Sequence, residues 1–501
     1  MKRSGIKGNA TLAVLLVLAL LAPAGAASRR SSHRRAAPPA PALVLPEATT
    51  PLAVALSPEV QAAARVSSAL GVHVVDLASG QTVYAYQPDE PRIIASNTKL
   101  LTTAATLHAL GPGYFFETRF LSRGAVRDGI LEGDLGVVGG GDPTISGRAW
   151  DGDAFAVFRG WARELAARGI RRVSGDLYLD GGLFEPLEVH PDWPRGQLAS
   201  WYEAPIAALS FSDNCILVRV SPGRPGGPVE VETVPPVPVF RVDNTARTVA
   251  SRRHGHLAIS RLGDLLRVAG AMSTADGPFD TWITVPDPVA YFGAALRAAL
   301  AEEGIALAGR LRPVDRLPGP VWERVAVFRS DLLSAVEVCL KHSQNFYAES
   351  MVKLLGARRC GRGSWGEGVR AVGEYLGGLG VSAAAFRLAD GSGMSRQNQA
   401  APRALTTLLR AVYATPEGAA FAQALPYGGE AMGGWKRRFA AAPYRGNVWA
   451  KTGTLEGVSA LSGYARAVSG RLYAFSVLLN RIHGDAHHAQ DRIVMALVDH
   501  G

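Results

Sequence analysis

The chain has 501 residues, of which 48% are apolar and 8% aromatic, so it can form two or three domains with sizeable cores. Its formal net charge is +10, but no aromatic interleaving or nucleic-acid motif accompanies the basic residues, so we expect no nucleic-acid partner. No stretch beyond the N-terminal region is long and apolar enough to cross a bilayer.

Residues 1–27 have the pattern of a signal peptide, with three basic residues, an apolar run at 10–21 and small residues at 24–26. An uncleaved anchor is the alternative. Removal of this segment lowers the net charge to +7, and residues 28–50 form a linker rich in Pro, Arg and Ala. We therefore expect an exported, periplasmic or otherwise extracytoplasmic protein. Its positive charge favours peripheral association with cell-wall polymers or anionic lipids, although an Arg-rich composition alone would also explain it.

The periodicity of apolar residues then predicts a helix at 57–70, a hairpin at 72–86 and a helix at 96–110. Residues 114–319 alternate strand-like segments with Gly/Pro turns and include a smaller β-rich module at about 215–285. Further helices are predicted at 330–342, 346–356, 366–379 and 404–414, followed by strands at 447–455, 459–467 and 472–480 and a helix at 486–498. This order predicts an α/β (α+β) catalytic domain, an antiparallel sheet with helices, formed by residues 51–113 and 320–501. Mainly β inserted domains at 114–319 would split it.

Lysine is rare in this chain, which makes its positions informative. Only seven of the 53 basic residues are Lys, at Lys2, Lys7, Lys99, Lys341, Lys353, Lys436 and Lys451. Arg keeps its proton at any workable pH, whereas a buried Lys can lose its proton and act as a base. Two of these lysines lie in short motifs that suggest such chemistry.

The first motif is Ser96-Asn97-Thr98-Lys99, at the start of a predicted helix. Residues three apart share one helix face, so Lys99 can take the proton from the Ser96 hydroxyl. The N–H groups at a helix N-terminus also stabilise negative charge that develops nearby. Alone, this pattern is better explained by a capping serine followed by a solvated lysine.

The second motif is Ser343-Gln344-Asn345, between two predicted helices. The Ser343 hydroxyl can relay a proton to a leaving amine, and the Asn345 carboxamide can bind a substrate amide. A helix-capping serine is the structural alternative.

The third motif is Lys451-Thr452-Gly453-Thr454, on or at the end of a strand. An edge strand can pair with an extended peptide, while Lys451 and Thr452 bind a terminal carboxylate and Gly453 permits close approach. Lys451 also offers a second positive charge that would lower the pKa of Lys99. A charged strand end is the alternative.

The three motifs in this order are typical of serine β-lactamases and penicillin-binding proteins. The chain resembles the low-molecular-mass class C penicillin-binding proteins, which are D-alanyl-D-alanine carboxypeptidases and endopeptidases with a long insertion after the nucleophile helix. The resemblance extends over nearly all of the chain after the leader and includes residues 139–144, 209–210 with 213–215, 343–349, 390–396 and 457–464.

The resemblance implies a role for each motif residue. Ser96 would be the acylated nucleophile and Lys99 the base, while Ser343, Asn345 and Lys451 would assist catalysis. Thr452, Gly453 and Thr454 would bind the substrate, and the backbone N–H groups of Ser96 and Thr454 would form an oxyanion hole. Two departures concern substrate positioning: relatives often have Asp at the position of Gln344, and Gly433-Gly434-Trp435-Lys436 replaces the usual Gly-Thr-Leu segment.

The predicted function is therefore hydrolysis of peptidoglycan stem peptides that end in D-Ala-D-Ala, with β-lactam antibiotics as covalent inhibitors. The alternatives are a β-lactamase and a catalytically silent wall-binding homologue. No cofactor or metal is expected, since His483, His487 and His488 are better explained as a solvated polar segment. Ser392 is interpreted as part of a turn, and Cys215, Cys339 and Cys360 as buried free thiols, with one disulfide as the alternative.

Overall fold

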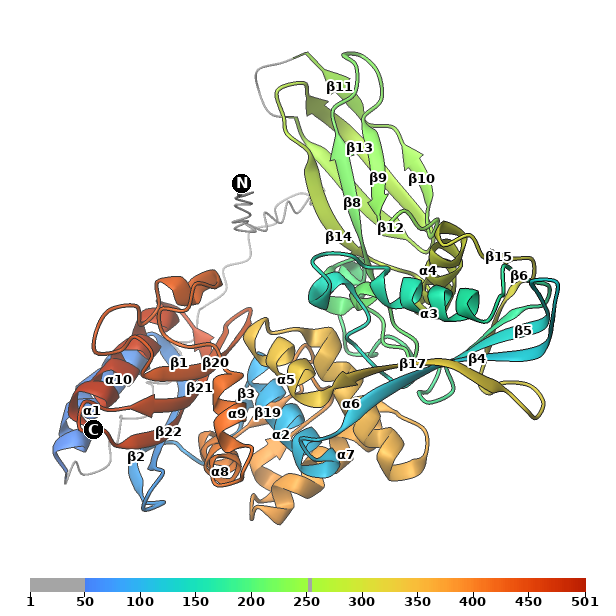
Figure 1. Ribbon diagram of the computed structural model, residues 1–501. Coiled ribbons are helices and arrows are strands. Elements are labelled where there is room, and N and C mark those ends of the chain that lie inside the picture. The colour runs from blue at the N-terminus through green and yellow to red at the C-terminus, as the bar shows by residue number, and fades with distance from the viewer. Residues whose placement is uncertain (1–49, 251–254) are drawn as a thin grey trace, which may run out of the picture.

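The computed structural model describes residues 50–250 and 255–501. The predicted leader at 1–27 lies outside the described residues, as does the predicted linker apart from its last residue. Within the described ranges, none of the helices combines the length and the apolarity that a membrane crossing requires. Figure 1 shows a sheet-and-helix unit that contains both the first and the last described segments, and a second unit that extends away from it.

The first unit is built on a five-stranded antiparallel sheet in the order β2-β1-β22-β21-β20. Its strands are β1 Ser67–Asp76, β2 Thr82–Tyr86, β20 Val448–Leu455, β21 Val458–Arg466 and β22 Leu472–Ile482. Helices α1 (Pro51–Ala64) and α10 (Ala486–His500) pack on one face, and α8 (Pro402–Tyr413) packs on the other. Alternate residues of β21 therefore belong to two cores, which explains why this strand is buried nearly throughout.

The N-terminal helix differs from the prediction. The sequence pattern indicated a helix at 57–70, but the helix is Pro51–Ala64 and β1 begins at Ser67. Thr50 caps this helix by accepting a hydrogen bond from Ala53 N (3.1 Å), and proline is favourable in the first turn. Pairing with β22 draws residues 67–70 into the sheet, where Ala69 lies opposite Asn480. The other elements predicted for this unit are confirmed within a few residues.

A helical layer lies beside the sheet and surrounds the helix that follows Ser96. It comprises α2 Thr98–Leu110, α5 Leu332–Lys341, α6 Asn345–Cys360, α7 Trp365–Gly378 and α9 Gly418–Gln423, together with a small sheet of β3 Arg92–Ile93, β18 Phe386–Arg387 and β19 Gln399–Ala400. Every residue of α2 from Thr98 to Leu107 is buried. Its threonine hydroxyls donate to backbone carbonyls, which satisfies these polar groups inside the core.

The inserted region leaves along β4 and returns along β17, two antiparallel neighbours in which Phe115 lies opposite Asp331. Its sheet has the order β15-β6-β5-β4-β17, with β7 beside β5 and β16 beside β7, and helices α3 and α4 cover it (Figure 1). These elements are β4 Phe115–Arg127, β5 Ile130–Val138, α3 Ala156–Ala167, β6 Arg172–Val173, β7 Leu177–Asp180, α4 Pro288–Glu302, β15 Ala306–Leu307, β16 Leu311–Val314 and β17 Glu323–Asp331. The insertion has a separate hydrophobic core.

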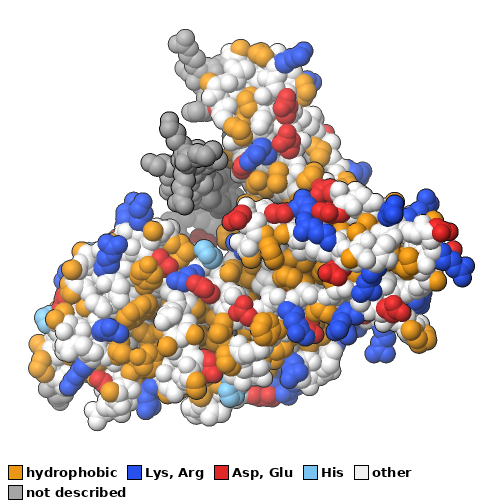
Figure 2. Space-filling model, in the orientation of Figure 1, with side chains coloured by type: hydrophobic (Ala, Val, Ile, Leu, Met, Phe, Trp, Pro, Cys, Tyr) orange, Lys and Arg blue, Asp and Glu red, His pale blue; other side chains and the backbone are white. Residues whose placement is uncertain are grey.

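A smaller group of strands projects from the insertion. It contains β8 Cys215–Ser221, β9 Glu230–Val234, β10 Arg241–Asn244, β11 Arg247–Val249, β12 Leu257–Leu262, β13 Leu265–Ser273 and β14 Phe279–Thr284. On the face shown in Figure 2, basic and acidic side chains are interspersed over both units. The domain limits given by the sequence, 51–113 with 320–501 around 114–319, remain a prediction.

Candidate active site

Ser96 lies in a tight turn, Ala95–Asn97, immediately before α2. Ala95 has a φ of 46°, a left-handed conformation that is unfavourable for alanine by roughly 1–2 kcal/mol. Two contacts hold it: Thr98 Oγ1 donates to Ala95 O (2.8 Å), and Gly393 packs so closely that a Cβ there would lie 1.9 Å from the same oxygen. The turn leaves Ser96 partly exposed, whereas Ala95 and Asn97 are buried.

The ammonium group of Lys99 lies beside the Ser96 hydroxyl. Lys99 Nζ is 3.1 Å from Ser96 Oγ, 2.7 Å from Asn345 Oδ1 and 2.8 Å from Ser392 O. Asn345 Oδ1 and Ser392 O can only accept hydrogen bonds. A neutral Lys99 amine would therefore direct its two N–H bonds at these acceptors and its lone pair at the Ser96 hydroxyl. Lys99 is therefore placed to take the proton of the Ser96 hydroxyl.

Burial shifts the protonation equilibrium of both lysines in the same direction. Lys99 is completely buried, and desolvation lowers its pKa to about 8, against the opposing influence of Cys339, Glu349 and Asp390. Burial also lowers the pKa of Lys451 well below its usual value, and the charge of Lys99 lowers it further. The charge of one lysine thus lowers the pKa of the other only at Lys451. At Lys99 the lowered pKa comes from desolvation.

The second motif contacts both lysines of the site. Ser343 Oγ accepts from Lys451 Nζ (2.9 Å), and Asn345 Nδ2 donates to Tyr202 O (2.8 Å). Ser343 does not cap a helix, because Gln344 occupies the N-cap of α6 and Ser343 has a φ of 55°. The Asn345 carboxamide bridges Lys99 and the insertion, an arrangement that the sequence did not reveal.

The third motif lies on β20, at the edge of the sheet beside the Ser96 turn. A Cβ at Gly453 would lie 2.5 Å from Ile94 O and 3.0 Å from Ser96 N, so glycine is needed for this approach. Lys451 is buried, Thr452 is partly exposed and Thr454 is exposed. The structure thus brings all eight predicted site residues into one region, with Ser96 between β20 and the second motif.

The sequence did not reveal that the loop of Ser392 contributes to this site. Ser392 was interpreted only as part of a turn, yet its carbonyl accepts a hydrogen bond from Lys99. Glu349 holds this loop by accepting from Gly391 N (2.9 Å) and Ser392 N (2.7 Å). Asp390 supports the loop as well, accepting from Gly393 N (2.7 Å). The Asp390-Gly391-Ser392-Gly393 pattern was the available signal.

The three cysteines are free thiols, so the alternative of a disulfide does not hold. Cys215 and Cys339 are buried as predicted, but Cys360 is exposed. Burial raises the pKa of the Cys339 thiol to about 12 although Lys99 and Lys451 lie near it. Cys339 therefore stays protonated and forms part of the core under the site.

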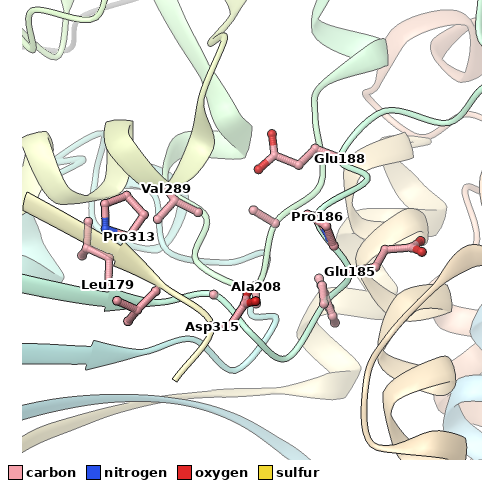
Figure 3. Close-up of a pocket in the computed structure, with 12 residues that line it drawn as sticks. Leu179, Glu185, Pro186, Glu188, Ala208, Val289, Pro313 and Asp315 are labelled. Carbon is pink, nitrogen blue, oxygen red and sulfur yellow. The ribbon is translucent and has the colours of Figure 1, made fainter. Parts of the chain in front are cut away.

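Two cavities are lined by residues outside the eight candidates. A cleft of about 690 Å³ is lined by Ile93 of β3, which precedes Ser96 by three residues, by Arg396 and by Val458 of β21. A second cavity of about 360 Å³ lies in the insertion, between β7, β16 and the start of α4 (Figure 3). Its lining includes Glu188, whose pKa is raised to about 7 by burial, but none of the eight candidate residues.

Comparisons with known proteins find D-alanyl-D-alanine carboxypeptidases. A model of the D-Ala-D-Ala carboxypeptidase 3 (S13) family matches residues 52–500. The chain is 35% identical over 448 residues to the D-alanyl-D-alanine carboxypeptidase of Actinomadura sp. (strain R39), covering 86% of this chain and 81% of that protein. It is 26% identical over 420 residues to D-alanyl-D-alanine carboxypeptidase DacB of Haemophilus influenzae, covering 82% of this chain and 85% of that protein. The crystal structure of penicillin binding protein 4 (dacB) from Haemophilus influenzae is similar with a TM-score of 0.76 and 25% identity, covering 88% of this chain and 98% of that one.

Proposed function

The chain belongs to the D-Ala-D-Ala carboxypeptidase 3 (S13) family, and from this premise we propose that it hydrolyses peptidoglycan stem peptides through an acyl-Ser96 intermediate. The resemblance to class C penicillin-binding proteins and the predicted fold class are confirmed. The contact that carries the proposed chemistry is Lys99 Nζ to Ser96 Oγ, 3.1 Å, in a buried setting that lowers the pKa of Lys99.

In acylation, Ser96 Oγ attacks the carbonyl carbon of the penultimate D-Ala while Lys99 Nζ takes the hydroxyl proton. The bond to the terminal D-Ala then breaks, and its nitrogen receives a proton through the Ser343 hydroxyl, which contacts Lys451. Water attacks the acyl carbon in the second half-reaction, releasing the shortened peptide and restoring the Ser96 hydroxyl. The N–H groups of Ser96 and Thr454 are the proposed oxyanion donors.

The peptide would bind in extended form along the edge of β20 after Ala450, because residues 426–428 pair with the start of this edge. Lys451 and Thr452 would receive the terminal carboxylate, and Gly453 would allow the scissile bond to reach Ser96. The acyl part of the peptide would extend toward the cleft lined by Ile93 and Val458, because Ile93 precedes Ser96 by three residues. The same groove accepts a D-Ala–diaminopimelate cross-link when its amine-side residue fits, which would make the protein an endopeptidase as well.

We infer that the protein acts outside the cytoplasm, on the basis of its wall substrate and its predicted leader. Peripheral association with the wall or membrane is a further expectation from its positive charge. The Haemophilus relative is named a penicillin binding protein, and this supports β-lactams as covalent inhibitors here. A β-lactamase is less favoured because no described group stands out as a base for rapid deacylation.

The test is the intact mass of the protein over time after addition of benzylpenicillin, with D-Ala release from a D-Ala-D-Ala peptide measured in parallel. A persistent adduct on Ser96 together with D-Ala release supports the proposal, and Ser96→Ala should abolish both. Rapid consumption of penicillin would instead identify a β-lactamase. The absence of adduct, drug consumption and D-Ala release would identify a silent homologue.

A further inference from the structure

The insertion packs into the catalytic helical core as well as forming a core of its own. Phe184, Trp193 and Ile206 belong to the same hydrophobic cluster as the helices around α2. The chain between these residues and β8 therefore lies against the second motif. Two of its polar groups contact residues next to Ser343, although they are separated from the motif by more than 130 positions in the sequence.

The first of these groups is the Asp213 carboxylate. Gln344 Nε2 donates to Asp213 Oδ2 (3.1 Å), and the same oxygen forms an ion pair with Arg148. The second group is Tyr202 O, which accepts from Asn345 Nδ2 (2.8 Å). The insertion thus binds the side chains of both residues that follow Ser343.

Asp213 is held in an uncommon conformation. Ser212, Asp213 and Asn214 have φ values of 51°, 55° and 52°, three successive left-handed residues none of which is glycine. Asn214 anchors this turn by donating to Pro205 O (2.8 Å) and Ser210 Oγ (3.0 Å) and by accepting from Phe211 N (3.1 Å). Such backbone persists only where the surroundings impose it, and it is concentrated at functional sites.

Ser343, on the other side of this contact, is also in a left-handed conformation, with a φ of 55°. In this conformation its hydroxyl accepts from Lys451, and its neighbour Gln344 is hydrogen-bonded to Asp213. We propose that Asp213 is a positioning residue for acylation, which acts through Gln344 to hold the Ser343 hydroxyl against Lys451. This role rests on the acyl-serine function proposed above, and it makes the insertion a structural part of the acylation site.

The residue type at position 344 follows from the same contact. An Asp or Glu at this position would place a carboxylate where this chain needs a donor toward Asp213. Gln344 supplies an N–H group, so the pair of residues is matched in polarity. Exchange of the polarity on both sides should keep the contact, and this makes the role testable.

The experiment measures the rate of Ser96 acylation by benzylpenicillin at saturating drug, together with the drug concentration at half-saturation. Gln344→Met keeps the length of the side chain and removes the donor, and we expect acylation to slow about 10- to 100-fold with little change in half-saturation. Gln344→Glu should slow it similarly, because two carboxylates then face each other. In Asp213→Asn/Gln344→Glu the amide and the carboxylate exchange places, so the hydrogen bond is reversed and Arg148 can pair with the new carboxylate at position 344 instead of the one at position 213. At least about 10-fold of the rate should then return.

The matched control is Asp280→Asn, which removes another Arg–Asp ion pair of the insertion, with Arg219, far along the chain on β14. It should be acylated at the wild-type rate. Melting temperatures of all variants separate a lower rate from lower stability. If Gln344→Met acylates like wild type, or if the double variant is no faster than Gln344→Glu, Asp213 has no positioning role. Ser96→Ala tests the acyl-serine function separately, since an adduct that persists in that variant would refute the function itself.

Discussion

Replacement of Gly453 by alanine tests how closely β20 must approach the nucleophile. The new Cβ would lie 2.5 Å from Ile94 O, about 0.9 Å short of the 3.4 Å at which ordinary contacts begin. It would also lie 3.0 Å from Ser96 N, a proposed oxyanion donor. Both partners are backbone atoms, so the strand and the Ser96 turn must separate by nearly 1 Å. A misplacement of this size reduces a reaction rate about 100-fold, equivalent to roughly 2.7 kcal/mol in the acylation barrier.

The assay is the second-order rate of benzylpenicillin acylation, followed by intact mass. Gly377→Ala is the matched control, because Gly377 lies in α7 and a Cβ there meets no atom within 4 Å. That substitution should leave acylation unchanged and raise stability by up to about 1 kcal/mol. Wild-type acylation by Gly453→Ala would refute the close-approach reasoning, and an equal loss in both variants would show that the assay reports stability instead.

Three further outcomes are expected. Lys99→Arg should slow acylation by about 10²–10⁴-fold, because a guanidinium group cannot act as the base. Lys436→Arg, at an exposed position, is the control and should have no effect. Near-normal acylation of Lys99→Arg would exclude Lys99 as the base. The wild-type acylation rate at low drug concentration should rise with pH up to about 8, the lowered pKa of Lys99, and then level, whereas a rate independent of pH between 6 and 9 would contradict this assignment. Burial raises the pKa of Glu203 from 4.5 to about 7, and its two carboxylate oxygens have no hydrogen-bond partner among the described residues. The wild type should therefore lose up to about 3 kcal/mol of stability as pH rises from 4.5 through 7, because the folded protein then has to bury the ionised carboxylate. Glu203→Gln should lack this loss in urea unfolding at pH 5 and pH 8, and parallel profiles would show that Glu203 does not titrate in this range.

The parts that the sequence predicted are those encoded locally. The helix from Ser96, the strand of Lys451 and the helices from α5 to α8 follow from apolar periodicity within about ten to twenty residues. The order of three short motifs then indicated one site, because each motif carries a residue type that the chemistry needs. The α1 boundary was wrong because Thr50, which caps that helix, was assigned to the linker and the helix was predicted to begin only at residue 57.

The parts that could not be predicted depend on contacts between distant segments. Nothing near Lys99 in the sequence indicates that Ser392 O will accept a hydrogen bond from it, since the two residues are 293 positions apart. The contact of Asp213 with Gln344 likewise spans 131 positions and requires three left-handed residues with no glycine among them. The hydrogen bonds between Glu349 and the Ser392 loop also join segments that are distant in the sequence. These groups position the catalytic side chains, and their positions are set only when the segments pack together.

The order of strands in the central sheet has a consequence for when the protein becomes active. β1 precedes Ser96 but pairs with β22, so Ser67 donates to the carbonyl of Asn480, 413 positions later. The sheet edge that carries Lys451 is attached through β21 to that same late strand. Pairing over such separations is slow, and it has to wait until almost the whole chain is available. A growing chain that already contains Ser96 thus has no assembled acylation site, and hydrolytic activity begins only with the closure of the last strands.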